Sequence, residues 1–444
     1  MTEPSRPVRI GNCSGFYGDR LSAMREMLEG AESGRSLDVL TGDYLAELTM
    51  LILGRDRLKD PSLGYARTFV RQVEDCLALA LERGVRIVSN AGGLNPSGLA
   101  SRIADIAAGQ GLSPSVAYVD GDDVRSLGPE LGLFHGALTA NAYLGGFGIA
   151  AALAGGADVV VTGRVTDASL VVGPATWWHG WRTTAYDELA GAVVAGHVLE
   201  CGCQATGGNF SGFRSLVATG STDAMARPLG FPIAEVAADG SSVITRHDGT
   251  GGLVSLDTVT AQLMYEVQSP AYLGPDVTAH LDSISLADGG PDRVHISGVR
   301  GSAPPERLKV CVNELGGHRN SVDLVLTGLD LEEKAAWVRA QLEPRLTASS
   351  VTWSLGALPR PDADTEEGAS VLLRCTVQDA SPDPVGRAFS GAVVELALAS
   401  YPGFTMTAPP GSGAPYGVYR AEYVDRGVVS HTVHHGDGST EVVA

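Results

Sequence analysis

The chain has 444 residues, of which 44% are hydrophobic, 19% charged and 6% aromatic, and 57 are glycine. This composition excludes a disordered protein, and the length exceeds what one hydrophobic core usually holds, so we expect a globular chain with one large and one smaller domain. The formal net charge of −19 disfavours nucleic acid and an anionic membrane surface as partners, because both would repel the chain at long range.

The cysteines and the hydropathy of the chain indicate the cellular compartment in which we expect the protein. Six cysteines are dispersed along the chain, and the N-terminus shows no apolar signal region. We therefore expect free thiols in the cytoplasm. Residues 142–157 form the longest apolar-looking stretch, but they are rich in glycine and run into Asp158. We expect a buried helix there and no membrane span.

From the N-terminus, short apolar strands alternate with polar turns and amphipathic helices. Strands are predicted at residues 8–10, 37–40, 85–89, 115–119 and 158–162. Parallel strands need crossover connections, so this alternation predicts an α/β domain over residues 8–254, with a mainly parallel sheet sandwiched by helices. Ligands of such sheets bind beyond the carboxyl ends of the strands, where the polar turns meet.

Residues 255–444 have a different pattern. A helix at 255–267 is followed by strand-like runs, a helix at 331–342, further strands and a helix at 386–400. This order predicts a smaller α+β layer domain. The Pro- and Gly-rich segment 407–417 predicts a loop, and the last stretch is expected as a solvated tail or an edge strand.

Several familiar fingerprints are missing. The chain has no Gly-x-Gly-x-x-Gly after its first strand, no Gly-x4-Gly-Lys-Ser/Thr, no Gly-x-Ser-x-Gly elbow and no His-Glu-x-x-His. A standard dinucleotide dehydrogenase, P-loop NTPase, α/β-hydrolase or zincin is therefore disfavoured.

The turn after the third strand carries glycines and a proline that can open a helix. Free N–H groups at a helix N-terminus can hold an anion, so this turn is either an anion site or only a tight turn. The candidate binding residues of this turn are Asn90, Gly92, Gly93 and Asn95. The candidates of the first turn are Gly11, Asn12 and Ser14. Asp19 and Asp43 close the first two turns, as carboxylates of one crevice or as helix N-caps.

Arg164 and Asp167 follow the apolar strand at 158–162. A charged pair at this depth is either a site cation with its acid/base partner or a structural ion pair. We favour the site, because the pair follows the carboxyl end of a strand.

Residues 197–209 hold the densest group of reactive side chains. Glu200 is a candidate general acid/base and Cys201 a candidate nucleophile. The candidate binding residues that follow are Thr206, Gly207, Gly208 and Asn209. His197, Cys201 and Cys203 also have metal-like spacing, but no second cluster of ligands is evident, so we assign no metal site. A weaker metal-like group near the C-terminus comprises His431, His434, His435 and Asp437, which we interpret as part of a solvated tail.

Together these loops resemble the acyclic terpene utilisation family, AtuA, over about residues 8–330. The motifs that carry the resemblance are Gly11-Asn12, Gly18-Asp19, Leu40 to Glu47, Lys59-Asp60-Pro61, Asn90 to Pro96, Thr139 to Gly145, Thr162 to Ser169, Gly196 to Gly202, Thr206 to Phe210, Pro232 to Glu235 and Gly249 to Val254. Cys203 departs from the alanine usual in the family, which weakens the metal interpretation. Some members carry an extra C-terminal ferredoxin-like domain, and this shorter chain is expected to end before one.

The resemblance implies a role in the bacterial breakdown of acyclic terpenoids such as geraniol and citronellol, whose later steps use coenzyme A thioesters. It implies no firmly assigned reaction. Our leading hypothesis is an enzyme acting on a carboxylated or thioester small molecule by acid/base chemistry, as a lyase, hydratase or isomerase. No redox cofactor is expected, and coenzyme A enters only as part of the substrate.

In this hypothesis the turns at Asn90 and Gly11 cradle an anionic group, and Arg164 neutralises a carboxylate or an enolate. Asp167 or Glu200 moves the proton. One alternative is a noncatalytic ligand-binding subunit or carrier for a partner acyl-CoA enzyme, and another is a metal-dependent hydrolase. We expect a homo-oligomer.

Overall fold

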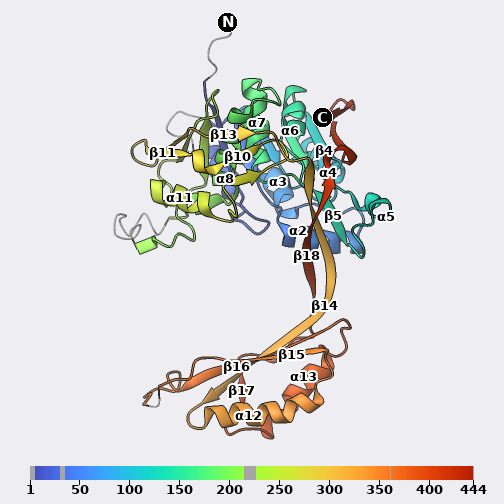
Figure 1. Ribbon diagram of the computed structural model, residues 1–444, viewed down its shortest axis with the longest axis vertical. Helices are drawn as coiled ribbons and strands as arrows, with labels where there is room; N and C mark the ends of the chain where they lie inside the picture. The colour runs from blue at the N-terminus through green and yellow to red at the C-terminus, as the bar shows by residue number, and fades with distance from the viewer. Residues whose placement is uncertain (1–5, 31–35, 215–226, 361, 444) are drawn as a thin grey trace. The chain divides into compact units, whose positions relative to one another are not determined.

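The computed structural model describes residues 6–30, 36–214, 227–360 and 362–443 (Figure 1). The chain divides into two compact units, of which the first comprises residues 1–313 and 419–444 and the second residues 314–418. The mixed α/β class predicted from the sequence is confirmed. The predicted boundary after residue 254 does not coincide with this division. Residues 255–313 belong to the first unit, because strands among them extend its main sheet.

The main sheet of the first unit is mixed. Its strand order is β11-β12-β8-β7-β1-β2-β3-β6-β4-β19-β20. The central strands run parallel to one another. They are β1 (Val8–Asn12), β2 (Val39–Gly42), β3 (Arg86–Ser89), β6 (Val159–Thr162) and β4 (Val116–Asp120). Their carboxyl ends therefore lie at one edge, as the sequence predicted.

Antiparallel strands extend the sheet on both sides. These are β7 (Pro232–Val236), β8 (Ser242–Arg246), β12 (Val294–Ser297), β11 (Ser285–Asp288), β19 (His431–His434) and β20 (Thr440–Val443). The sheet is thus parallel only at its centre, which corrects the prediction of a mainly parallel sheet. The interpretation of His431 and His434 as a solvated tail is wrong, because β19 pairs with β4 at the sheet edge.

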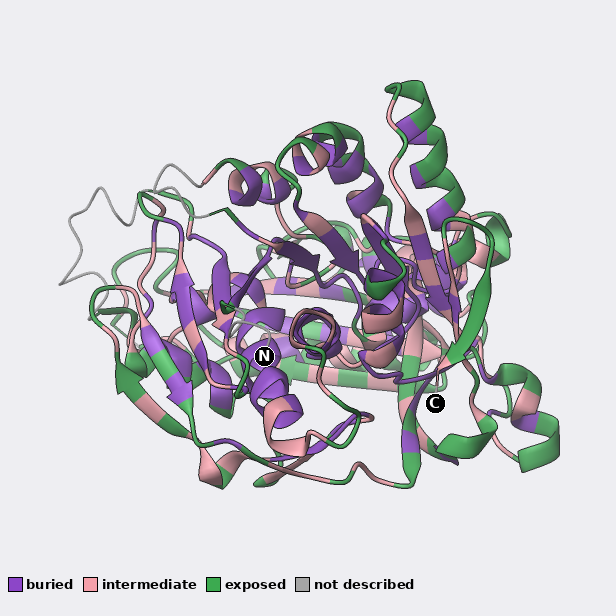
Figure 2. Cartoon of the chain, turned by 90° about the horizontal axis from the view of Figure 1, so that it is seen from above, coloured by how far each residue is buried: buried purple, intermediate pink, exposed green. Residues whose placement is uncertain are grey.

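Neighbouring residues of the central strands enter two different cores. On β6, Val159 and Val161 pack in one core and Val160 in the other. The first core includes residues of α1 (Ala23–Glu29), α3 (Arg67–Glu82) and α4 (Pro96–Gly109). The second includes residues of α6 (Phe147–Ala154), α7 (Ser169–His179) and α8 (Tyr186–Glu200). Figure 2 shows the buried central strands and the partly exposed helices around them. Burial on both faces explains why these strands are continuously apolar in the sequence.

Four further elements flank the main sheet of the first unit. Helix α2 (Glu47–Lys59) follows β2, and β5 (Thr139–Ala142) pairs with the start of β14. A small antiparallel sheet consists of β9 (Ala271–Leu273), β10 (Thr278–His280) and β13 (Arg300–Ser302), and it packs against α8. Helix α11 (Leu256–Met264) packs against the end of α8, and Ser255 caps it.

The second unit has the strand and helix order β-α-β-β-α-β. Its elements are the later part of β14 (Arg307–Thr327), α12 (Leu331–Leu342), β15 (Ser350–Leu355), β16 (Ser370–Asp379), α13 (Arg387–Val394) and β17 (Thr405–Met406). The strand order β15-β16-β14-β17 is that of ferredoxin-like folds. This unit is followed by residues 419–444 of the first unit, so it does not test the expectation about an extra C-terminal domain, which stays a prediction.

The segment 407–417 is a loop only in its first half, because β18 (Ala414–Asp425) begins within it. In the described ranges, no helix has the length and apolar character needed to cross a membrane.

Candidate functional site

A buried ion pair follows the end of β6. Arg164 is 2% exposed, and its Nη1 donates to the backbone oxygen of Val165 and to the carboxylate of Asp167. The Nε of Arg164 is buried and has no hydrogen-bond partner among the described residues. The side chain of Asp167 is 33% exposed. The pair therefore combines an enclosed cation with a carboxylate that solvent reaches.

Two further contacts hold Arg164, one at its backbone and one at its guanidinium. Its backbone N–H donates to Oδ2 of Asp122 at 2.8 Å. Its Cζ lies 4.3 Å from the ring centroid of Tyr143, whose hydroxyl donates to Oε1 of Glu47 at 2.8 Å. Contacts of this kind stabilise a buried cation. Sequence analysis did not select Tyr143 or Glu47 individually, although both lie in motifs that carry the family resemblance.

The turns after β2 and β3 are joined through side chains. Nδ2 of Asn90 donates to Oδ1 of Asp43 at 2.6 Å, and the backbone N–H of Tyr44 donates to Oδ1 of Asn90 at 2.8 Å. Burial raises the pKa of Asp43, the carboxylate of Asp167 adds to this rise, and Arg164 opposes it. Asp43 therefore lies within electrostatic reach of the ion pair, on the side of β2 and β3.

A second acid/base pair ends α8. Nδ1 of His197 lies 3.0 Å from Oε1 of Glu200, and the two side chains are only 4% and 7% exposed. Burial raises the pKa of Glu200, although His197 opposes the rise. Burial acts to lower the pKa of His197, but the neighbouring carboxylate outweighs it and the pKa is raised. Nε2 of His197 and Oε2 of Glu200 are buried without hydrogen-bond partners among the described residues.

Glu200 and Asp167 interact electrostatically, because each carboxylate disfavours a second negative charge near it. The structure thus brings together Arg164, Asp167, Asp43, His197 and Glu200, which we call the charged cluster. Three of these residues follow or flank strand ends predicted from the sequence. The role of His197 as the partner of Glu200 was missed, although the i, i+3 spacing on one helix face indicates it.

Other predicted residues of the first turn form hydrogen bonds to backbone groups. Nδ2 of Asn12 donates to the oxygen of Leu199, and the hydroxyl of Ser14 donates to the oxygen of Phe16. Asp19 accepts from the backbone N–H groups of Gly15 and Arg20. Each of these contacts lies within the first turn or ties it to α8.

Close packing explains the glycines of these turns. A Cβ on Gly11 would meet the side chains of Met27 and Leu37, and a Cβ on Gly92 would lie 2.5 Å from the oxygen of Thr162. Gly93 has a φ of +54°, which favours glycine. Asn95 caps α4, since its Oδ1 accepts from the N–H of Gly98 at 3.0 Å.

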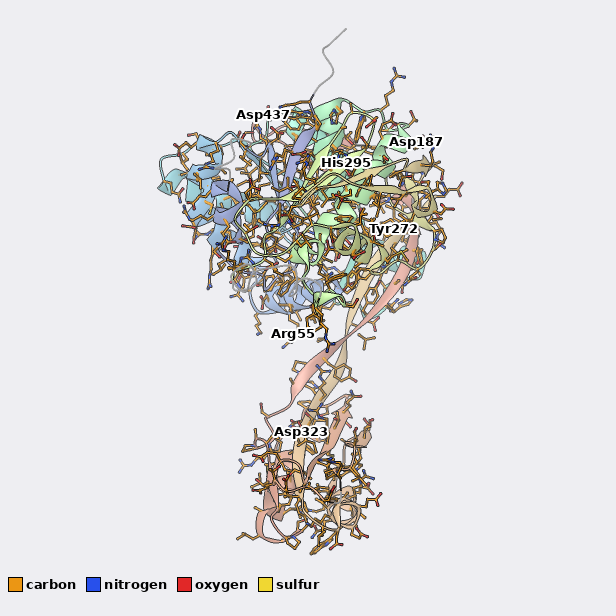
Figure 3. The ribbon with its side chains drawn as sticks, turned by 90° about the vertical axis from the view of Figure 1, so that its left-hand side faces the viewer. Arg55, Asp187, Tyr272, His295, Asp323 and Asp437 are labelled. Carbon is orange, nitrogen blue, oxygen red and sulfur yellow. The ribbon has the colours of Figure 1, made fainter. Side chains whose placement is uncertain are left out.

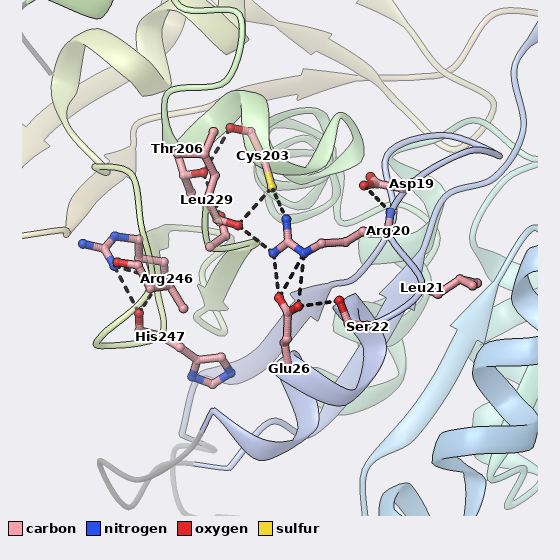
Figure 4. Close-up of polar contacts among 12 residues, drawn as sticks. Asp19, Arg20, Leu21, Ser22, Glu26, Cys203, Thr206, Leu229, Arg246 and His247 are labelled. Carbon is pink, nitrogen blue, oxygen red and sulfur yellow. Dashed lines mark hydrogen bonds and ion pairs between the residues drawn. The ribbon is translucent and has the colours of Figure 1, made fainter. Parts of the chain in front are cut away.

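The residues after Glu200 separate in space. Burial and then the Glu200 carboxylate raise the pKa of Cys201, so this thiol stays protonated near neutral pH. Arg20 contacts both Glu26 and the sulfur of Cys203, whose thiol donates to the oxygen of Leu229 (Figure 4). Cys203 therefore has a local structural environment.

Thr206 to Asn209 also make local contacts. The hydroxyl of Thr206 reaches the oxygens of Cys203 and Gly230, and Nδ2 of Asn209 donates to Oε1 of Gln204. Gly207 has a φ of +109°, and a Cβ on Gly208 would lie 2.9 Å from the oxygen of Cys203. In the part of the chain that is described, no group of three or more His, Cys, Asp or Glu side chains has an arrangement suited to a metal ion.

A pocket of about 330 Å³ lies beside the charged cluster. Its lining includes Arg57, Asn95, Asp123 and Asn141, and it meets the cluster at Asp122, which accepts from the N–H of Arg164. The pocket is not lined by Arg164, Asp167 or Glu200. The pocket has polar groups of its own, since Asp122 and Asp123 line it and Oδ1 of Asn141 is buried without a hydrogen-bond partner among the described residues.

The family model described as "Acyclic terpene utilisation family protein AtuA" matches residues 8–435. The match extends beyond residue 330, where the resemblance read from the motifs weakened. No significant match is found among the curated proteins or among the solved structures.

Proposed function

Because the chain belongs to the acyclic terpene utilisation family, we propose that it is an enzyme acting on a carboxylated or acyl-thioester small molecule with a terpenoid-like or branched skeleton. It does so by acid/base chemistry, as a lyase, hydratase or isomerase. The observation that carries the proposal is the enclosed His197–Glu200 pair, with an unpartnered atom on each member, beside the buried Arg164 and the accessible Asp167. Groups of this kind cluster at catalytic sites.

Asp167 is the group that first meets the substrate, since its side chain is the exposed member of the pair. Its carboxylate removes a proton from the carbon next to a carbonyl group. The C–H bond breaks, the proton bonds to the carboxylate oxygen, and the electron pair moves to the carbonyl oxygen. The N–H groups of Arg164 stabilise the resulting oxyanion.

The pair of Glu200 and His197 supplies the second proton transfer. Burial raises the pKa of Glu200, which favours its protonated form and suits it to donate a proton. Return of a proton to a different carbon gives an isomer, and proton donation to a leaving oxygen gives dehydration or cleavage. These steps change no oxidation state overall, so the proposal needs no redox cofactor, and coenzyme A enters only as part of the substrate. We further propose a cytoplasmic homo-oligomer.

The test is a ligand and turnover screen with coenzyme A, short and branched acyl-CoAs and the corresponding free acids. Native mass spectrometry and thermal shift measure binding, and mass spectrometry of the small molecules measures turnover. We expect Asp167→Asn and Glu200→Gln each to remove turnover. The matched controls are Asp75→Asn and Glu74→Gln, which alter exposed ion pairs on α3.

Unchanged turnover in both site variants would contradict the proposal. Ligand binding without turnover of any compound would favour the noncatalytic carrier instead. Stoichiometric zinc or iron found by elemental analysis would favour the metal-dependent hydrolase.

A further inference from the structure

Tyr272 enters the charged cluster from a distant part of the chain. It is the central residue of β9 and pairs with Ala279 of β10. Its ring centroid lies 5.4 Å from that of His197, with 53° between the ring planes. Figure 3 labels Tyr272 in the first unit. Because strand pairing fixes its backbone, Tyr272 is held by regular structure and not by a loose loop.

The hydroxyl of Tyr272 makes no hydrogen bond to any residue in the described ranges, and the phenol stays protonated. Burial raises its pKa well above the usual value, and the carboxylates of Glu200, Asp167 and Glu266 add to the rise, while Arg164 opposes it. Together with the ring contact to His197, these interactions put Tyr272 within electrostatic reach of the charged groups. A protonated phenol donates one hydrogen bond, so the cluster contains an O–H group that still lacks an acceptor.

The cations around this hydroxyl are already engaged. Arg164 is paired with Asp167, and His197 is bonded to Glu200. Nζ of Lys309 lies 4.9 Å from the ring centroid of Tyr143, and its charge helps to lower the pKa of Glu47. A free carboxylate placed at Tyr272 would therefore face the negative charge of Asp167 without a new cation to balance it. A neutral carbonyl oxygen adds no charge and can accept the hydrogen bond.

We propose that Tyr272 donates its hydrogen bond to the carbonyl oxygen of the substrate, and that this carbonyl is neutral, as in a thioester, and not a free carboxylate. The inference rests on the proposed function and narrows its substrate class. When Asp167 takes the neighbouring proton, the negative charge develops on this same oxygen. Tyr272 O–H and an N–H of Arg164 then stabilise it from two sides, which makes Tyr272 a catalytic residue.

The first arm of the test compares two probes with the same acyl group. These are the N-acetylcysteamine thioester of 3-methylbutanoic acid, which is neutral, and the free 3-methylbutanoate anion. Calorimetry measures binding, and mass spectrometry measures deuterium uptake next to the carbonyl in D2O. We expect the thioester to bind at least about tenfold more tightly than the anion, because like charges repel the anion, and to be the probe that exchanges. Equal or tighter binding of the anion, or no binding of the thioester, overturns the inference.

The second arm compares Tyr272→Phe with the wild-type protein. Loss of one oxyanion donor is expected to lower kcat for exchange of the thioester by about 10²-fold while KM stays within about threefold. The control is Tyr65→Phe, which removes another partly buried hydroxyl without a hydrogen bond in the described residues. A loss of folding in Tyr272→Phe would show as a lower Tm and a changed circular dichroism spectrum. In that case Tyr272→3-fluorotyrosine, which keeps the ring and hydroxyl but makes the phenol a stronger hydrogen-bond donor, must change kcat for exchange, and an unchanged kcat overturns the inference.

Two failures can be told apart. If Tyr272→Phe exchanges like the wild type while Asp167→Asn and Glu200→Gln lose exchange, this inference is overturned and the proposed function stands. If none of the three variants changes exchange, the proposed function falls with it.

Discussion

Asn12, the last residue of β1, donates from Nδ2 to the backbone oxygen of Leu199 in the last turn of α8, over 2.6 Å. Both residues are buried. This contact joins the first strand of the sheet to the helix that carries His197 and Glu200, between residues 187 positions apart in the sequence. The amide of Asn12 therefore helps to position the acid/base pair relative to the sheet.

Asn12→Asp replaces this donor by a carboxylate that faces a carbonyl oxygen. We expect the free energy of unfolding to fall by about 1–3 kcal/mol, because a buried acceptor loses its partner. Urea unfolding measures this change. The control is Gln110→Glu, since the amide of Gln110 donates to the oxygen of Glu74 at an exposed position. Equal effects of the two substitutions would show that the Asn12 contact has no special weight.

Gly92 tests the close approach of the third turn to β6. A Cβ at this position would lie 2.5 Å from the backbone oxygen of Thr162, so Gly92→Ala is expected to lower the free energy of unfolding by about 1–3 kcal/mol. Gly109 ends α4, and a Cβ there meets nothing within 4 Å. Gly109→Ala should be neutral or stabilise by up to about 1 kcal/mol. The opposite order of the two Tm values would refute this packing.

Asp122 gives a pH dependence of stability. Burial raises the pKa of its carboxyl from 3.8 to about 7, although the Arg164 backbone N–H and Asn141 both oppose the rise. Between these values the folded chain holds a proton that the unfolded chain has released, so stability falls as the pH rises from about 4 to about 7 and then levels off. The amide in the Asp122→Asn variant does not ionise, so this contribution to the pH dependence is removed.

We expect the Asp122→Asn variant to show a smaller decrease in the free energy of unfolding between pH 5 and pH 7 than the wild type does. Urea titrations at half-unit pH intervals measure it. Asp276 contributes a slope of the same sign, since its pKa is raised to about 6 by burial, against the opposing Gly146 N–H. Parallel curves for wild type and variant would contradict the assignment to Asp122.

The reactivity of the Cys201 thiol distinguishes acid/base catalysis from nucleophilic catalysis. Because burial and Glu200 raise the pKa of its thiol, iodoacetamide at pH 7 should label Cys201 more slowly than a free cysteine. Cys201→Ser should keep most of the turnover. Peptide mapping and the turnover screen measure the two effects. Rapid labelling together with complete loss of turnover in Cys201→Ser would favour the nucleophile over the carboxylates.

The central strands and part of the cluster could be predicted from the sequence. The continuous apolar run at 159–161 marks a strand buried on both faces, and a charged pair directly after it marks the ligand edge of a parallel sheet. For the same reason Asp43 and Asn90 were found. These predictions needed only local patterns and one rule about where parallel strands end.

Other features depend on contacts between distant residues. Tyr272 lies on a strand of three residues, too short to give a period, and only its packing against α8 brings it to His197. Thr206 and Asn209 follow Glu200 closely in the sequence, yet their side chains bond to local groups, because a helix end and a left-handed turn redirect the chain. The division of the chain was missed since β11 and β12 alternate like strands of a separate α+β domain.

The most direct measurement is exchange of solvent deuterium into a branched acyl thioester next to its carbonyl, followed by mass spectrometry in the wild type, Asp167→Asn and Glu200→Gln, with Asp75→Asn as the control. Proton transfer by the charged cluster predicts exchange in the wild type and in Asp75→Asn, and a loss of at least about 10²-fold in both site variants. Equal exchange in all four proteins would contradict the account.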